Sequence, residues 1–144
     1  MIDSRRTLKP KTSERGQSLT ELAVSFVLLI IILAVMVDLG RVFFSFISLR
    51  EAAEEGALYG SLNPEDNEGI IDRVRSSSTT PVDLADNSLV AVNVTSTGVC
   101  AGETLTVTVT YTYQLTMPFV SEVLGTQQFP LTVDAKSTIL RPEC

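Results

Sequence analysis

The sequence contains no histidine, which removes several classes of catalytic and metal site. Without imidazole, neither a Ser-His-Asp triad nor a Cys-His nucleophile pair is available, and histidine-based metal sites are excluded. The glycine-rich fingerprints of P-loop and dinucleotide-binding proteins are also missing. We therefore expect no enzymatic activity, no cofactor and no bound metal.

Basic side chains are scarce beyond residue 16. From Gln17 onward the chain has six basic and fifteen acidic side chains, a net charge of −9. This part of the chain would repel the phosphates of a nucleic acid or an anionic lipid surface, so neither is an expected partner. Residues 1–16 have the opposite balance, with five basic and two acidic side chains and a net charge of +3.

Residues 22–37 contain no charged side chain, and their one polar residue is Ser25. At about 1.5 Å per residue, this run of 16 residues spans roughly 24 Å, short of the roughly 30 Å hydrocarbon core of a membrane. Apolar residues continue to Phe44 and complete the span. We therefore predict a transmembrane segment over about residues 22–44.

Two other structures are compatible with an apolar run of this length. A buried core helix is disfavoured because so small a domain could hardly cover the run on all sides. The apolar region of a secretory signal is disfavoured because no A-x-A-like cleavage site follows, and residues 37–41 read Val-Asp-Leu-Gly-Arg instead.

The basic N-terminal segment indicates the orientation in the membrane. Residues 1–16 are polar and contain Pro10, which is typical of a leader without regular structure. The positive-inside rule keeps such a segment in the cytoplasm. We predict a single-pass protein of the cytoplasmic (inner) membrane, with its N-terminus inside and residues 63–144 outside as an extracytoplasmic domain.

One long helix is expected over residues 17–62. Ser18 and Glu21 form an S-x-x-E capping box ahead of the apolar run, and no strong stop signal occurs before residues 60–64. In the second half of this helix, small and apolar residues recur at helical spacing and predict a stripe that packs against a sheet or another helix. These residues are Leu49, Ala52, Ala53, Gly56, Ala57 and Leu58.

The remaining sequence predicts a small domain and an α+β fold class. Ile70, Ile71 and Val74 indicate a short amphipathic helix, and residues 119–124 allow one or two helical turns. Three segments alternate apolar and polar residues, at 90–95, 105–115 and 129–135. We expect a three-stranded antiparallel sheet with an apolar face over the long helix and a threonine-rich outer face.

The acidic residues Glu65, Asp66 and Glu68 have oxygen ligands of the kind that calcium prefers, but they lack the alternating spacing of an EF-hand loop. We interpret them as a solvated turn whose carboxylates lie favourably at a helix N-terminus.

The two cysteines, Cys100 and Cys144, both follow the apolar run and would lie where oxidation is permitted. In the up, down, up order of the three predicted strands, both cysteines reach the same end of the sheet. We predict a disulfide that closes 45 residues, worth roughly 4 kcal/mol in the chain-entropy model.

Three charged residues border the apolar run. Asp38 and Arg41 lie three positions apart on one helical face, which favours a structural ion pair. Glu21 has no basic residue at the next three or four positions, where Val24 and Ser25 stand. Either the capping box satisfies Glu21 locally, or its carboxylate awaits a cation from another molecule.

Residues 15–22, Arg-Gly-Gln-Ser-Leu-Thr-Glu-Leu, resemble the processing site of type IV pilin-like precursors. Together with Asp38-Leu39-Gly40-Arg41 and with residues 50–60, they are similar to the TadE-like family of minor pilins and pseudopilins. The resemblance covers about 45 of the 144 residues. Major pilins of Tad systems are much shorter and have tyrosine where this chain has Leu22, so the resemblance favours a minor subunit.

The resemblance implies that a prepilin peptidase cuts between Gly16 and Gln17. Glu21 then becomes the fifth residue of the mature chain, the position of the assembly glutamate in type IV pilins. The implied partners are other pilin or pseudopilin subunits, the pilus assembly platform and the membrane. The alternative is an uncleaved, membrane-anchored protein whose outer domain binds a ligand or a surface through the threonine-rich face and the acidic turn.

Overall fold

The computed structural model describes residues 14–116, 122 and 125–141 of the chain. Two helices and three strands follow in the order α1 (Glu14–Leu62), α2 (Asn67–Ser76), β1 (Val90–Ser96), β2 (Thr104–Gln114) and β3 (Gln128–Thr138). The predicted α+β class is confirmed. Contacts divide the chain into two compact units, one up to Met36 and the other from Val37 onward.

The first unit contains the N-terminal part of α1, which begins before the predicted cap. The helix starts at Glu14, so Ser18 lies inside it and the predicted capping box is wrong. Once a long helix is nucleated, each added residue gains a backbone hydrogen bond. Even Gly16 costs only about 1 kcal/mol relative to alanine, so the helix extends upstream of its apolar run.

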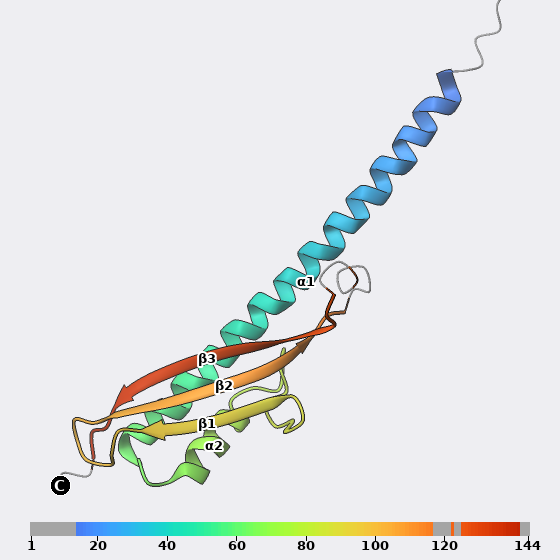
Figure 1. The fold of residues 1–144 in the computed structure, drawn as a ribbon. Helices are drawn as coiled ribbons and strands as arrows, with labels where there is room; N and C mark the ends of the chain where they lie inside the picture. The colour runs from blue at the N-terminus through green and yellow to red at the C-terminus, as the bar shows by residue number, and fades with distance from the viewer. Residues whose placement is uncertain (1–13, 117–121, 123–124, 142–144) are drawn as a thin grey trace, which may run out of the picture. The chain divides into compact units, whose positions relative to one another are not determined.

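The second unit contains a three-stranded antiparallel sheet in the order β1, β2, β3, as predicted (Figure 1). Val107 in the central strand pairs with Val94 of β1 and with Ala135 of β3. The next residue, Thr108, pairs with Asn93 and Asp134, so successive rows at the centre of the sheet point to an apolar and to a polar face in turn. One continuous core lies on the apolar face, and its largest fully buried side chains include Leu49, Ile70, Leu84, Leu105 and Ile139.

The C-terminal half of α1 presents its small residues to this core. Leu49, Ala52, Ala53 and Ala57 are buried as predicted, but the expectation for Leu58 is wrong because its side chain is 65% exposed. Each residue turns a helix by about 100°, so the residue after Ala57 leaves the buried face. Gly60 and Ser61 continue the stripe instead.

Two glycines of α1 allow its close contact with the rest of the domain. A Cβ added at Gly56 would collide with Val74 of α2, and one added at Gly60 would lie 2.9 Å from atoms of Ile70 and Leu105. The expected close approach to a sheet or helix is therefore confirmed. Both neighbours are present, because α2 and β2 each pack against this stripe.

The acidic turn between the two helices has the role that the sequence indicated. Asp66 is the N-cap of α2, and its carboxylate accepts a hydrogen bond of 2.9 Å from the backbone N–H of Gly69. Ile70 and Val74 form the buried face of α2. The predicted short amphipathic helix is confirmed.

Some sequence predictions lie outside the described residues. They concern residues 1–13 of the leader, most of the helical turns expected over 119–124, and Cys144.

Candidate functional site

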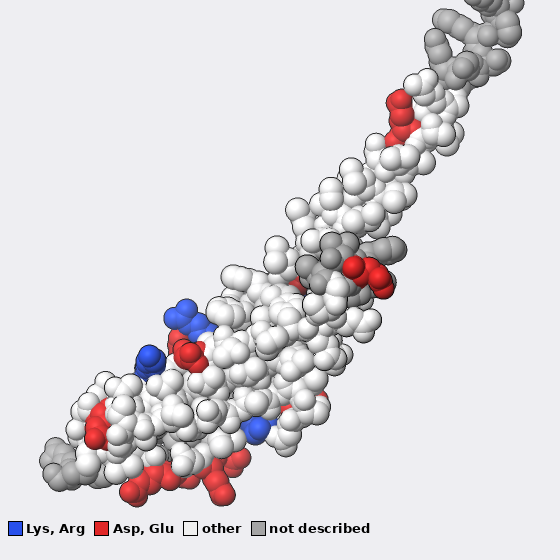
Figure 2. All heavy atoms as spheres, in the orientation of Figure 1, with Lys and Arg blue, Asp and Glu red and all other residues white. Residues whose placement is uncertain are grey.

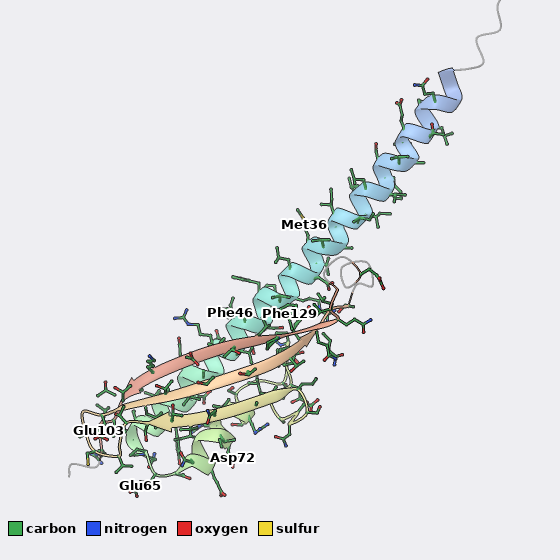
Figure 3. All side chains as sticks on the ribbon, in the orientation of Figure 1. Met36, Phe46, Glu65, Asp72, Glu103 and Phe129 are labelled. Carbon is green, nitrogen blue, oxygen red and sulfur yellow. The ribbon has the colours of Figure 1, made fainter. Side chains whose placement is uncertain are left out.

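The part of α1 within the first unit exposes apolar side chains around its whole circumference. Between Leu22 and Val37, the large apolar residues are 43–71% exposed. Figure 3 shows side chains projecting from all sides of this part of α1, as far as the labelled Met36. The helix is long and apolar enough to cross a membrane. A surface of this kind requires lipid or other apolar helices around it.

Glu21 has a local hydrogen-bond donor that the sequence reasoning did not identify. The Gln17 side-chain amide donates to Glu21 Oε1 over 3.3 Å, one helical turn away. Both residues are exposed, and so is Gly16, whose Cβ position has no atom within 4 Å. The bond is long for an N–H···O contact, so a charged donor could replace the amide at little cost. Glu21 and the predicted cleavage position therefore lie on the same exposed stretch of helix.

The next charged residues of α1 lie at the start of the second unit. Asp38 is buried at 3% exposure, whereas Arg41 is exposed and donates from Nη1 to Thr116 Oγ1 over 2.7 Å. Arg41 thus connects α1 to the segment that follows β2. The predicted ion pair of Asp38 and Arg41 stays a prediction.

Tyr113 lies beside these two residues. Its side chain is 3% exposed, and its hydroxyl has no hydrogen-bond partner among the described residues. Burial raises the pKa of Tyr113; the nearby Arg41 charge opposes this effect and the Asp38 charge adds to it. The phenol therefore stays protonated at neutral pH and retains its donor hydrogen.

A cleft of about 760 Å³ opens next to this group. It lies within the second unit, between α1, the end of β2 and the segment before β1. Its described lining includes Arg41, Phe44, Pro81, Tyr111, Tyr113 and Thr116. The cleft therefore combines one cation, several hydroxyls and an apolar wall.

Acidic side chains gather elsewhere on the second unit. Figure 2 shows them on the side of the molecule where Figure 1 places α2. Figure 3 labels two of them, Glu65 and Asp72. Within the part of the chain that the structure describes, no group of three or more His, Cys, Asp or Glu residues is arranged to hold a metal ion.

Cys100 lies in the turn between β1 and β2. The same turn is hydrogen-bonded to the chain just after β3: Gly102 N donates to Ile139 O over 2.9 Å, and Ile139 N donates to Glu103 O over 2.8 Å. Because Ile139 is only five residues before Cys144, this geometry is compatible with the predicted bridge. The pairing itself stays a prediction, since Cys144 lies outside the described residues.

Neither Tyr113 nor Thr116 is among the site residues expected from the sequence. Tyr113 lies within the alternating segment 105–115, which predicts only a strand residue, and Thr116 lies just after that segment. The one available signal was the position of both residues at the end of the strand, where a side chain can reach back to α1. That signal is too weak to have identified Arg41 as the hydrogen-bond donor to Thr116.

Residues 16–58 match a protein-family model described as TadE-like protein. This match confirms the resemblance seen in the sequence, and it begins at the glycine of the predicted cleavage position. No curated protein and no solved structure matches the chain. Residues 16–58 are thus similar to TadE-like proteins, and the helix that is long and apolar enough to cross a membrane lies largely within this match.

Proposed function

We propose that this chain is a minor pilin or pseudopilin that takes part in the assembly of a Tad-type pilus and is not a catalyst. The observation that carries this proposal is the exposed apolar part of α1, which lies within the family match. The same helix is suited first to a membrane and then to a bundle of similar helices in a filament.

Cleavage between Gly16 and Gln17 would prepare the helix for assembly. The cut would occur on the cytoplasmic side of the inner membrane, where the basic leader lies, and a prepilin peptidase would perform it. It would remove the positive leader and create a new α-amino group at Gln17. The apolar helix would stay with the mature chain, whose domain from residue 63 lies outside the cytoplasm.

Glu21 would then pair with the α-amino group of a neighbouring subunit. An unpaired carboxylate among apolar helices is costly, and so is an unpaired ammonium. A pair between subunits removes both costs and fixes their axial register. The present donor to Glu21 is the neutral side-chain amide of Gln17, at 3.3 Å. A charged amine in its place would form a stronger, charge-assisted hydrogen bond.

Pilus counts in the organism of origin test this role of Glu21. We expect Glu21→Ala to be cleaved as the unaltered protein is, but to lower the number of assembled pili at least tenfold. Thr20→Ala is the matched control, because the Thr20 hydroxyl bonds only to backbone carbonyls of Gly16 and Gln17 within the described helix. A Glu21→Ala strain with a normal number of pili would contradict the pairing role.

The alternative function is an uncleaved anchor whose outer domain binds a ligand or a surface. The outer face of the sheet is its candidate contact, since Thr110 and Thr132 form a hydroxyl pair there at 3.2 Å and Thr132 is exposed. The two functions predict different first residues of the mature protein, because only a pilin-like subunit requires removal of the leader.

A further inference from the structure

The cleft beside Arg41 differs in charge from the rest of the domain. From Gln17 onward the chain has six basic and fifteen acidic side chains, yet the described lining of this cleft contains the Arg41 guanidinium and no carboxylate. The nearby carboxylate, Asp38, is buried on α1, and its charge reaches Tyr113 at the edge of the cleft. A lining with one cation and no carboxylate, in an otherwise acidic domain, is suited to an anionic group.

The hydrogen-bond donors of the cleft are suited to a phosphate diester. A guanidinium has five N–H groups, and the bond to Thr116 Oγ1 uses Nη1 of Arg41, so other donors remain. The protonated Tyr113 hydroxyl has no partner among the described residues, and Tyr111 also lines the cleft. Arginine and neutral hydroxyls together bind the oxygens of a singly charged phosphate well.

The position of the cleft on α1 indicates where such a phosphate would come from. Arg41 lies little more than one helical turn beyond Met36, where the first unit ends. Around Arg41 the helix exposes Leu39, Phe43 and Phe44, whose exposed fractions are 67%, 61% and 64%. Aromatic residues and an arginine directly after an apolar span are typical of the head-group layer of a membrane.

We propose that this cleft binds the phosphate of a phospholipid head group, with Arg41 as the anchoring cation. The lipid is phosphatidylethanolamine, because a head group without net charge is compatible with an acidic domain. Phe44, on the wall of the cleft, contacts the glycerol and upper acyl region. The proposal requires the membrane anchor but not pilus assembly, so the two can fail separately.

Lipid titration of the full-length chain in detergent micelles tests this site. The probe is dihexanoyl-phosphatidylethanolamine, and native mass spectrometry counts the bound molecules. We expect one saturable site in the unaltered chain and at least tenfold weaker binding in Arg41→Gln. Arg41→Lys retains the charge and should retain most of the affinity.

Arg50→Gln is the matched control, because Arg50 is paired with Glu54 at 2.8 Å and does not line the cleft. This variant should bind the lipid as the unaltered chain does. If Arg41→Gln does not fold, Thr116→Val replaces it, since it removes the hydroxyl that holds Arg41, and several-fold weaker binding is expected. Unchanged affinity in the folded variant would overturn the proposal. Displacement of the lipid by an equal concentration of inorganic phosphate would also overturn it and would indicate a site for free phosphate.

Discussion

The Tyr59 hydroxyl donates a hydrogen bond of 2.8 Å to Asp66 Oδ2, and this bond connects the last turns of α1 to the start of α2. The other carboxylate oxygen of Asp66 accepts the Gly69 N–H of the capped helix. Arg73 lies over the Tyr59 ring, 5.7 Å from its centre, and its Nη1 lies 3.6 Å from Glu55 Oε1. One carboxylate thus joins the two helices that flank the core.

Asp66 should make the stability of the domain depend on acid pH. The Gly69 N–H and then the Tyr59 O–H hold the pKa of Asp66 below its ordinary value of 3.8. Its contribution to the free energy of unfolding is therefore fully present above pH 3.8 and is lost as the pH falls through the lower, folded-state pKa. In Asp66→Asn, the amide oxygen still accepts from Gly69 but does not titrate.

Urea unfolding of the full-length chain in detergent at pH 7 and pH 2.5 measures this difference. The unaltered chain should have a higher free energy of unfolding than Asp66→Asn at pH 7, and this difference in free energy should be smaller at pH 2.5. Comparison with the variant is needed because Asp86, whose pKa Ser88 lowers, also contributes to acid sensitivity in both chains. An equal difference in the free energy of unfolding at both pH values would show that Asp66 does not act through its charge.

Gly56 and Gly40 form a matched pair of helical glycines in α1. A Cβ at Gly56 would collide with Val74, whereas a Cβ at Gly40 has no atom within 4 Å. We expect Gly56→Ala to lower the free energy of unfolding by about 1–3 kcal/mol, because the core is overpacked there. Gly40→Ala should raise it by up to about 1 kcal/mol through helix propensity. Thermal unfolding of both variants in one detergent compares them, and a similar change in both would argue against tight packing at Gly56.

The predicted bridge between Cys100 and Cys144 should stabilise the domain. In the chain-entropy model, opening a loop of this length costs about 4 kcal/mol, and engineered bridges often give less. Cys144→Ser and a chemically reduced sample should therefore unfold at the same lowered temperature, because each removes the same crosslink. Mass analysis after thiol alkylation measures the bridge directly, and two alkylated cysteines in the oxidised protein would exclude it.

Much of the second unit could be predicted from local patterns. The alternation of Leu105, Val107 and Val109 with threonines assigns β2 and its buried face, because a one-residue slip would expose every apolar side chain. The position of the acidic residues just before an amphipathic segment predicts that their carboxylates lie at a helix N-terminus, and the structure identifies Asp66 as the N-cap. These features depend on residues that are close together in the chain.

Local sequence patterns could not predict the features that depend on tertiary contacts. The hydrogen bond between Arg41 and Thr116 joins residues 75 positions apart, and neither side chain has a local signal for the other. Leu58 is a different kind of error, because nine helical residues at about 100° each place it on the face opposite to Leu49, so its exposure follows from the helical period itself. The capping box predicted at Ser18 and Glu21 was wrong, because a capping pattern does not prevent a strongly helix-forming segment from beginning upstream of it.

The N-terminal mass of the protein extracted from the membranes of a host with an active prepilin peptidase tests the central claim most directly. We expect a chain that begins at Gln17. Gly16→Val, in the same host, should keep its leader and serves as the uncleaved reference. An unaltered protein that begins at Met1 in this host would exclude processing after Gly16 and would favour the uncleaved surface-binding anchor.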